Sequence, residues 1–379
     1  MNKGFDYDSG LKQLLLIAKR NNKKAKLSLI KKAFNFSKHS HKSQKRASGE
    51  DYFIHPFNVA LLLAEQGMDS ETICAALLHD VLEDTSANEK KILKEFGSDI
   101  CSMVKGLTKI KLIIGKPKHH AKSEYIQKIL LSSIHDVRII IVKLFDKLHN
   151  MRTIEFLPKK KQKRIALEVL DFYVPLAHKL GVHILKHELA DLAFPIVNPK
   201  ICNEIERKII VRVHKDEKEF LNAAEIVRKS ASKHGIDAFA YLRHKSPFAI
   251  FSKMETRKKS FEEVYDYLLI TVLVDSVPEC YELLGIIHNE FAPIPLKMKD
   301  FIAIPEPNLY QAIHTSVLTN RGKKIKFYIM TRKMAEINKH GIIALLNRNI
   351  SKKELNEKIG FLQNISKIDK HSLIDPKFL

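Results

Sequence analysis

Four ionisable residues stand in an otherwise apolar stretch of the sequence, ALLHDVLEDT at residues 76–85. Residues four apart on a helix share a face, so this spacing places His79 beside Glu83 and Asp80 beside Asp84. Burying that many ionisable groups without compensation costs several kcal/mol each. Imidazole and carboxylate groups together suit manganese, iron or zinc, so the stretch predicts a divalent metal site. A buried ion-pair network is the alternative, although the stretch itself contains no lysine or arginine.

Two further ligand-type residues stand in other segments that we expect to be helical. His55 directly precedes Pro56, and proline is common at the start of a helix. Asp146 lies in KLFDKLHN, within a segment that is otherwise apolar at helical spacing. The resulting order, H…HD…D on the helices of one domain, is the pattern of the HD phosphohydrolase superfamily.

The segments that must position these residues are helices. Apolar residues recur at helical spacing with short connections, which predicts one all-α domain over residues 1–196. The expected helices are HPFNVALLLAEQG, SETICAALLHDVLEDT with Ser70 as N-cap, SEYIQKILLSSI, VRIIIVKLFDKLHNMRTI and RIALEVLDFYVPLAHKLG.

The composition changes after this helical domain. Residues 197–234 predict connecting helices, with apolar residues at helical spacing among many charges. Residues 235–348 predict a smaller mixed α/β domain, because YDYLLITVLVD, KDFIAI, AIHTSVLT and KIKFYIM indicate strands and ECYELLGIIHNEF indicates a helix. Residues 349–379 predict a short helix with a Lys-rich tail. The expected fold class is therefore α+β multidomain.

The composition excludes several classes of protein. The 379 residues are 45% hydrophobic, which is enough for ordinary cores and argues against wholesale disorder. No apolar run approaches the roughly 18 residues that span a bilayer, and no signal-peptide pattern opens the chain. We therefore expect a soluble, cytoplasmic protein with no membrane partner. Four scattered cysteines fit reduced thiols in that compartment.

The chain is strongly basic, with a formal net charge of +22. Such an excess favours anionic partners, nucleotides among them. The charge leaves nucleic acid or the ribosome open as partners, but the lysines are spread along the chain and no motif indicates either. A Lys-rich surface that keeps the protein soluble is the other interpretation.

Three stretches resemble the hydrolase domain of the RelA/SpoT homologues, the bacterial enzymes of stringent-response alarmone metabolism. They are HKSQKRASGEDYFIHPFNVALLLAEQGMDSETICAALLHDVLEDT, VKLFDKLHNMRT and LDFYVPLAHKLG, and the match covers about residues 35–195. The resemblance implies removal of the 3′-pyrophosphate from ppGpp and pppGpp, with manganese as cofactor. It implies that Glu83 and Asp84 are the acidic pair that activates water. The implied metal ligands are His55, His79, Asp80 and Asp146.

Cations that bind the phosphates of such a substrate should flank the metal. The residues that the resemblance assigns to substrate binding are Lys45, Arg46, Ser48, Asn150, Arg152 and Thr153. Ala47 stands where the family usually has a basic residue, so one contact is expected to be missing. Ordinary surface charge is the alternative interpretation of each cation.

Residues 241–346 resemble the synthetase domain of the same family, a nucleotidyltransferase-like fold that transfers pyrophosphate from ATP to GDP or GTP. Asp266 matches the magnesium-binding aspartate, and Tyr310 matches the tyrosine that stacks on guanine. The other matching site positions are Arg243, Lys245, Lys253, Lys299, Gln311 and His314.

The departures from the synthetase pattern predict that synthesis is lost. The family's catalytic strand EIQIRT corresponds here to KFYIMT, and alternate residues of a strand face opposite sides. The core side stays apolar, with Ile325, Phe327 and Ile329. The site side, where the family has Glu, Gln and Arg, consists of Lys326, Tyr328 and Met330. Lys326 puts a cation where magnesium requires a carboxylate, so magnesium is not expected at this domain. Thr271 and Leu309 replace a family arginine and glycine.

We therefore predict a monofunctional alarmone hydrolase with a degenerate synthetase-like domain. A bifunctional enzyme with residual synthesis is one alternative. A non-catalytic guanine-nucleotide sensor is a rival of another class, although a sensor need not keep the full H…HD…ED…D set. An HD enzyme acting on a different nucleotide is a third, because the guanosine 3′-pyrophosphate assignment rests on the resemblance.

Overall fold

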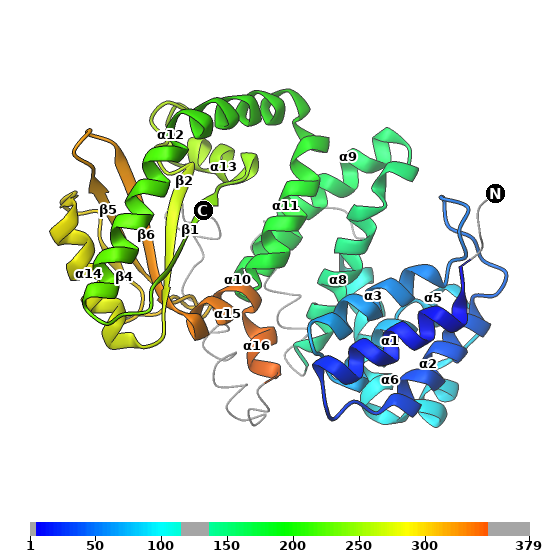
Figure 1. Cartoon of the computed structure of the whole chain (residues 1–379). Coiled ribbons are helices and arrows are strands. Elements are labelled where there is room, and N and C mark those ends of the chain that lie inside the picture. The colour runs from blue at the N-terminus through cyan, green and yellow to red at the C-terminus, as the bar shows by residue number, and fades with distance from the viewer. Residues whose placement is uncertain (1–4, 115–135, 348–379) are drawn as a thin grey trace. The chain divides into compact units, whose positions relative to one another are not determined.

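The computed structural model describes residues 5–114 and 136–347 of the chain (Figure 1). These residues form two compact units that divide between Leu176 and Ala177, with residues 345–347 belonging to the first unit. The sequence analysis instead ended the helical domain at residue 196, and its division of the chain stays a prediction. The expected helix in SEYIQKILLSSI and the expected tail at 349–379 lie outside the described residues.

The first unit is helical, as the sequence predicts. Its elements are α1 (Tyr7–Asn21), α2 (Leu27–Ser40), α3 (Ile54–Glu65), α4 (Ser70–Leu78), α5 (Val81–Asp84), α6 (Glu89–Ile114), α8 (Arg138–Arg152), η1 (Ile154–Phe156), α9 (Lys159–Glu168) and η2 (Val169–Tyr173). The N-cap of α4 is Asp69 rather than the expected Ser70, because the Asp69 carboxylate accepts from the N–H of Thr72 at 2.7 Å.

The expectation of one continuous helix over residues 70–85 is wrong at its centre. Helix α4 ends at Leu78, and α5 begins only at Val81, with His79 and Asp80 in the turn between them. The imidazole of His79 contributes to this break, because its Nδ1 donates to the Ala76 carbonyl at 2.7 Å, the acceptor that the next helical turn would use. The expectation that His79 and Glu83, or Asp80 and Asp84, share one face of a continuous helix therefore does not apply.

The segment RIALEVLDFYVPLAHKLG was expected to form one helix. It runs instead through α9, the π-helical turn η2 and α10 (Val174–Lys179). Pro175 lacks the N–H that would donate to the carbonyl of Asp171, which fits a local widening of the helix at this point.

The second unit is mixed α/β, which confirms the expected fold class. Its helices are α11 (His183–Val197), α12 (Pro199–Lys233), α13 (Pro247–Arg257), α14 (Val277–Glu290) and α15 (Arg332–His340), followed by α16 (Ile342–Leu346). Its strands are β1 (Phe239–His244), β2 (Leu268–Val274), β3 (Ala292–Pro293), β4 (Lys299–Asp300), β5 (Ile313–Leu318) and β6 (Lys324–Thr331). The sheet order is β1-β2-β6-β5-β3, with β4 paired to β5, and among these described strands only β2 and β6 run parallel.

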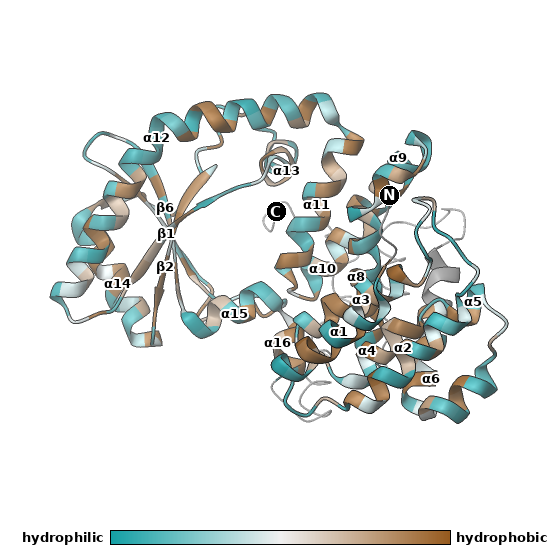
Figure 2. Cartoon of the chain, turned by 45° about the vertical axis from the view of Figure 1, so that its right-hand side comes forward, coloured by the Kyte–Doolittle hydropathy of each residue, from teal (hydrophilic) through white to brown (hydrophobic). Residues whose placement is uncertain are grey.

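Several details of this unit differ from the sequence analysis. Strand β1 was not predicted, and KDFIAI is a strand only at its first two residues, after which the chain turns. The predicted connecting helices are one long helix, α12, along which hydrophilic and hydrophobic residues alternate (Figure 2). The hydrophobic residues include Phe220 and Val227, which are fully buried in the core of this unit.

The two faces of the sheet have different roles. One face packs against α12 and α14, which enclose the core (Figure 1). Ile325, Phe327 and Ile329 are fully buried in that core, which confirms the predicted alternation of β6. The alternate residues of the same strand, Lys326, Tyr328 and Met330, line a cavity on the other face.

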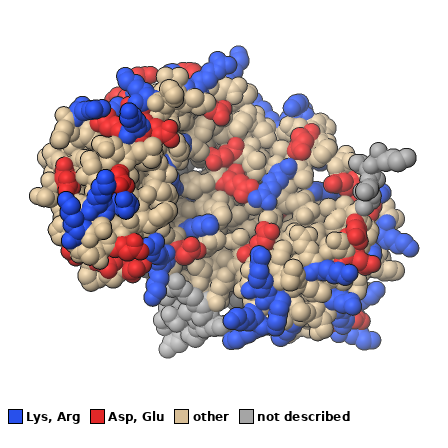
Figure 3. Space-filling view, in the orientation of Figure 1, with Lys and Arg blue, Asp and Glu red and all other residues tan. Residues whose placement is uncertain are grey.

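The charged residues of the surface and the apolar residues of the helices are distributed as follows. On the face seen in Figure 3, lysine and arginine side chains are scattered among acidic ones. Among the described residues, no helix is both long enough and apolar enough to traverse a bilayer.

Candidate active site

The first unit brings the four predicted metal ligands together. His55 comes from the first turn of α3, His79 and Asp80 from the α4–α5 turn, and Asp146 from α8, and all four are buried. The Nε2 atom of His55 lies 3.1 Å from Asp146 Oδ1, and that of His79 lies 3.2 Å from Asp80 Oδ2. Across the described part of the chain, one group of three potential ligands has all its ligand atoms within 4.8 Å of one another, and it consists of His55, His79 and Asp80.

The hydrogen bonding of His79 leaves one ring nitrogen available to a metal. Its Nδ1 donates to the Ala76 carbonyl, which can only accept, so the lone pair stays on Nε2. This buried Nε2 has no hydrogen-bond partner among the described residues. Metal-ligating histidines commonly fix their tautomer through such a bond from the other ring nitrogen. The orphaned lone pair therefore fits a metal ligand.

His55 is oriented through His149 and Arg46. The guanidinium of Arg46 can only donate, and its Nη1 lies 3.4 Å from His149 Nδ1, which makes that atom an acceptor. His55 Nδ1 lies 2.9 Å from the same atom and must then carry the proton. The Nε2 atom of His55 consequently keeps its lone pair on the side of Asp146. Burial, with His55 and Arg46 close by, lowers the pKa of His149 to about 3, so that its ring is neutral.

The charges of this group call for a further cation. Burial opposes charging of Asp146, but Lys143 Nζ lies 2.6 Å from its Oδ2 and holds its pKa well below the usual range. Burial also opposes protonation of His79, but the adjoining Asp80 carboxylate raises the pKa of His79 to about 9. Two buried carboxylates thus face one lysine, and the missing charge is either a proton on His79 or a metal ion that displaces it. The residues fit a divalent ion.

The predicted acidic pair lies directly after the ligands, on α5. Asp84 is exposed, and its Oδ2 lies 2.9 Å from the hydroxyl of Tyr52, which also lies 2.8 Å from Asp80 Oδ2. Gln44 Nε2 donates to the carbonyl of Asp84 and tethers the same turn. Glu83 is half-buried. Asp84 is therefore held beside the predicted ligand Asp80, by a turn rather than by a continuous helix.

Three of the predicted substrate-binding residues form one connected group. Arg46 Nη2 donates to Asn150 Oδ1 at 2.8 Å, and Arg46 Nη1 lies 3.5 Å from Thr153 Oγ1. Asn150 Nδ2 in turn donates to Asp146 Oδ1 at 2.7 Å. A cation that could meet a substrate phosphate is thus linked through one amide to a predicted metal ligand.

The other three predicted substrate-binding residues are Lys45, Ser48 and Arg152. Lys45 is exposed and paired with Asp51, and Ser48 Oγ donates to Glu50 at 3.0 Å. Arg152 is exposed at the end of α8. Their assignment to the substrate stays a prediction.

The sequence analysis missed three residues of the site: Tyr52, Lys143 and His149. A signal existed for the last two, because both lie three residues from Asp146 on α8 and therefore share a helical face with it. Tyr52 carries no such signal, because the turn that places Asp80 and Asp84 against it depends on the break between α4 and α5.

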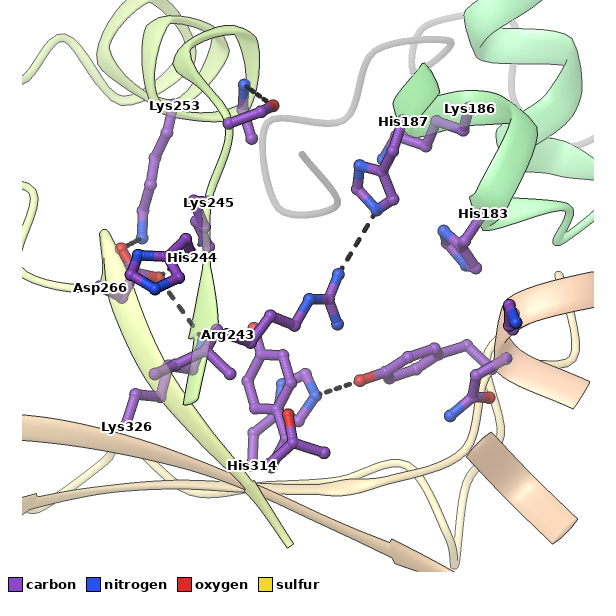
Figure 4. A pocket seen from close by; sticks show the side chains of 18 of the residues that line it. His183, Lys186, His187, Arg243, His244, Lys245, Lys253, Asp266, His314 and Lys326 are labelled. Atoms are coloured by element: carbon purple, nitrogen blue, oxygen red, sulfur yellow. Dashed lines mark hydrogen bonds and ion pairs between the residues drawn. The ribbon is translucent and has the colours of Figure 1, made fainter. Parts of the chain in front are cut away.

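The second unit gathers the residues that match the synthetase pattern around its cavity, with the exception of Gln311 (Figure 4). Asp266 is 1% exposed and is surrounded by lysines. Lys253 Nζ contacts its Oδ1, Lys245 Nζ donates to its Oδ2 at 2.9 Å, and Lys326 Nζ lies 3.8 Å from the same Oδ2. Both oxygens of Asp266, which matches the family's magnesium-binding aspartate, therefore face lysine ammonium groups.

The aromatic residues of this cavity are joined to one another. The Tyr310 hydroxyl lies 2.7 Å from His314 Nε2, and the Tyr328 ring stacks on His314 with 3.8 Å between ring centroids. Lys299 Nζ lies 5.6 Å from the centroid of the Phe301 ring.

Two positions that differ from the family's synthetase pattern, Thr271 and Leu309, also affect the local structure. Thr271 is buried, and its hydroxyl has no partner among the described residues. Leu309 has a φ of 73°, a left-handed conformation that costs a residue other than glycine about 1–2 kcal/mol. A glycine would relieve this strain, and the sequence analysis expected one in the family at this position.

Two known families match the chain. Residues 33–183 match the HD domain, and residues 242–351 match the region found in RelA and SpoT proteins. The first match contains the buried histidine–aspartate group, so the first unit is an HD-domain unit, which implies a divalent metal. The second match contains the cavity and the strand that carries Lys326.

Two curated relatives match most of this chain. A guanosine-3′,5′-bis(diphosphate) 3′-pyrophosphohydrolase of Aquifex aeolicus is 43% identical over 316 residues, covering 83% of this chain and 45% of the relative. A GTP pyrophosphokinase rsh of Brucella ovis is 39% identical over 316 residues, covering 83% of this chain and 42% of the relative. The chain thus spans less than half the length of either relative. It belongs to the RelA/SpoT family.

A solved structure of a metazoan orthologue of SpoT that hydrolyses ppGpp is 23% identical to the chain. The match covers 43% of this chain and 93% of the chain in that structure, with a TM-score of 0.32.

Proposed function

We propose that this protein hydrolyses guanosine 3′,5′-bis(diphosphate), ppGpp or pppGpp, to GDP or GTP and pyrophosphate in a manganese-dependent reaction, and that it has lost alarmone synthesis. The single observation that carries the hydrolase proposal is the buried group of His55, His79, Asp80 and Asp146. Both imidazoles keep the lone pair of Nε2 on the side of the carboxylates. The Aquifex relative, a guanosine-3′,5′-bis(diphosphate) 3′-pyrophosphohydrolase, supplies the substrate of this proposal.

Each residue of the group has a distinct role in this proposal. His55, His79, Asp80 and Asp146 would hold the manganese ion. The ion, when bound, lowers the pKa of a water molecule toward neutrality and draws charge from the phosphoryl oxygens. Glu83 accepts the proton of the attacking water, and Tyr52 keeps Asp84 beside Asp80 through its hydroxyl.

Arg46 is the proposed phosphate-binding cation of the site. Its guanidinium is held by Asn150, which is itself bonded to Asp146. This arrangement fixes the position of a positive charge relative to the metal group before the substrate arrives. A preorganised guanidinium binds a phosphate with less loss of side-chain entropy than a free one does.

Removal of the metal tests the hydrolase proposal directly. We expect ppGpp to be converted to GDP and pyrophosphate, with activity abolished by excess EDTA and restored by manganese. Nucleotide chromatography of timed samples measures the conversion, and metal analysis of the dialysed protein measures the ion. Undiminished hydrolysis by protein shown to be metal-free would contradict the proposal.

The lysines around Asp266 support the loss of synthesis. Magnesium requires oxygen ligands, and both oxygens of Asp266 face ammonium groups of Lys245, Lys253 and Lys326. The side of β6 that faces the cavity also presents Tyr328 and Met330, where the family pattern has glutamine and arginine. Transition-state stabilisation in phosphoryl transfer depends mostly on positioning and charge from several groups.

We expect no ppGpp from ATP and GDP, and no rescue by Lys326→Glu alone. The Lys326→Glu substitution restores one carboxylate but leaves Thr271, Tyr328 and Met330 unchanged. When catalytic groups act as a unit, restoring one of them recovers little activity. The assay should use labelled ATP in a His79→Ala background, so that any product escapes hydrolysis. Added ppGpp must be recovered intact as a control. Labelled ppGpp from the Lys326→Glu chain would show that one substitution separates this domain from activity.

A further inference from the structure

His41, directly after α2, is a buried polar residue with no role in the proposed mechanism so far. It is 1% exposed, and its backbone N–H donates to the Ser37 carbonyl at 3.0 Å, which ties it to the last turn of the helix. Its Nδ1 lies 2.7 Å from Gln44 Oε1, whereas its buried Nε2 has no hydrogen-bond partner among the described residues. A buried polar atom without a partner costs free energy, and phenylalanine would avoid that cost. The contact of Nδ1 therefore has to account for a histidine here.

The contact between His41 and Gln44 fixes the direction of the Gln44 amide. The Nε2 group of Gln44 donates to the backbone carbonyl of Asp84. Its Oε1 can only accept, so Nδ1 of His41 carries the proton of their shared hydrogen bond. If the amide were turned over, its oxygen would face the carbonyl oxygen of Asp84, and the ring N–H would face an NH₂ group. His41 thus keeps the donor of Gln44 directed at Asp84.

The ring of His41 also packs against Tyr52, the other residue that holds Asp84. The two rings stack with centroids 4.9 Å apart and planes inclined by 28°. The Tyr52 hydroxyl lies 2.8 Å from Asp80 Oδ2 and 2.9 Å from Asp84 Oδ2. The backbone N–H of Tyr52 donates to the Gln44 carbonyl at 3.0 Å. Two residues therefore hold the backbone and the carboxylate of Asp84, and both of them contact the same imidazole.

These contacts matter because α5, which carries Glu83 and Asp84, is very short. It consists of a single four-residue turn, and a single turn is not stable by itself. Asp84 is exposed, so burial does little to fix its position. A misplacement of about 1 Å in a reacting group can cost about 10²-fold in rate. The position of the acidic turn therefore depends on contacts from outside α5.

We infer that His41 is a positioning residue of the hydrolase site. Through the Gln44 amide, and through the ring of Tyr52, it holds the turn of Glu83 and Asp84 in the orientation that proton transfer from the attacking water requires. Because it acts through other residues, it should affect turnover rather than metal binding. The expected effects on rate rest on the proposed hydrolysis of ppGpp, whereas the contacts of His41 can be tested without it.

His41→Phe is the central variant, and His39→Phe is its matched control. The first keeps an aromatic ring beside Tyr52 and removes the Nδ1 donor together with the unpartnered Nε2. The second makes the same change at an exposed histidine of α2. We expect kcat for ppGpp to fall about 10- to 100-fold in His41→Phe, with KM, manganese content and melting temperature near the parental values. His39→Phe should leave all four unchanged. An unchanged kcat in folded His41→Phe would overturn the inference.

A double-variant cycle tests whether His41 acts through Gln44. Gln44→Met removes the donor to Asp84 at nearly constant volume and should lower kcat by a factor similar to that of His41→Phe. In the chain with both substitutions the two losses should not multiply, because each breaks the same series of contacts. Losses that multiply fully would overturn the inference. Should His41→Phe fail to fold, Gln44→Met alone decides, since an unchanged kcat there contradicts the inference equally.

Hydrogen exchange of the full chain in excess EDTA tests the contacts without any measurement of activity. We expect the backbone amides of residues 81–85 to exchange about fivefold faster in His41→Phe and in Gln44→Met than in the parent, with those of α4 unchanged. Parental exchange of the 81–85 turn in both variants would overturn the inference. A parent chain that shows the expected exchange but does not hydrolyse ppGpp would count against the proposed function alone.

Discussion

We expect the His79→Ala variant to lose bound manganese and ppGpp hydrolysis together, with the rate falling roughly 10³-fold or more. The substitution removes the one buried ring nitrogen whose tautomer is fixed by the Ala76 carbonyl and whose lone pair has no partner in the described structure. Without it, Asp80 loses the imidazole nitrogen that lies 3.2 Å from its Oδ2. Asp80→Ala should act in the same direction, because it deletes another proposed ligand.

The matched control is His39→Ala, which removes an exposed histidine from α2 of the same unit. It should keep both metal and activity. Metal content after dialysis and the initial rate of ppGpp hydrolysis are measured on the same samples, and thermal melting reports whether each variant is folded. A folded His79→Ala protein that retains stoichiometric manganese would show that this nitrogen is not a ligand. If the parent protein contains no metal and the His79→Ala variant fails to fold, the buried ion-pair network would be favoured instead.

The pattern of ligand-type residues was readable from the sequence, but its geometry was not. The order H…HD…D identified His55, His79, Asp80 and Asp146, which the structure brings within a few ångströms of one another. The helical period failed between the second and third of the stretch's ionisable residues, because the chain turns at His79 and Asp80, before Glu83. A side-chain bond to a backbone carbonyl competes with the helix there, and residue spacing carries no trace of such a bond.

The charge balance of the metal group depends on a residue from a distant segment. The sequence analysis argued against an ion-pair network because the stretch 76–85 has no lysine, yet Lys143 on α8 contacts Asp146 at 2.6 Å. Local composition could not reveal this cation, because tertiary packing supplies it. The same limit applies to Tyr52, which lies against two carboxylates of another element.

The sheet was more predictable on its core side than along its edge. The alternation in β6 follows from strand geometry alone, so the burial of Ile325, Phe327 and Ile329 could be predicted. Strand β1 has no clear alternation, because it lies at the edge of the sheet and its burial pattern is mixed. The meeting of Lys245, Lys253 and Lys326 at one carboxylate required the sheet order, which sequence patterns did not provide.

We expect Glu83→Gln to separate catalysis from metal binding. In our proposal this carboxylate takes the proton of the attacking water and does not touch the ion. Glutamine has the same shape but cannot accept that proton, so turnover should fall roughly 10²- to 10⁴-fold, the usual contribution of a general base. Manganese content should stay at the parental level, because the predicted ligands His55, His79, Asp80 and Asp146 are all unchanged. Steady-state hydrolysis and metal analysis of the same preparation measure the two quantities.

Glu65→Gln is the matched control for this prediction, because it makes the same change at an exposed glutamate at the end of α3. It should leave both turnover and manganese unchanged. The pH dependence adds a second criterion: if Glu83 is the base, the acidic limb of the rate profile should be lost or displaced in Glu83→Gln, since that limb reports protonation of the base. Release of manganese from folded Glu83→Gln would instead make Glu83 a ligand. Unchanged turnover with unchanged metal would leave Asp84, held by Tyr52, as the acidic residue that handles the proton.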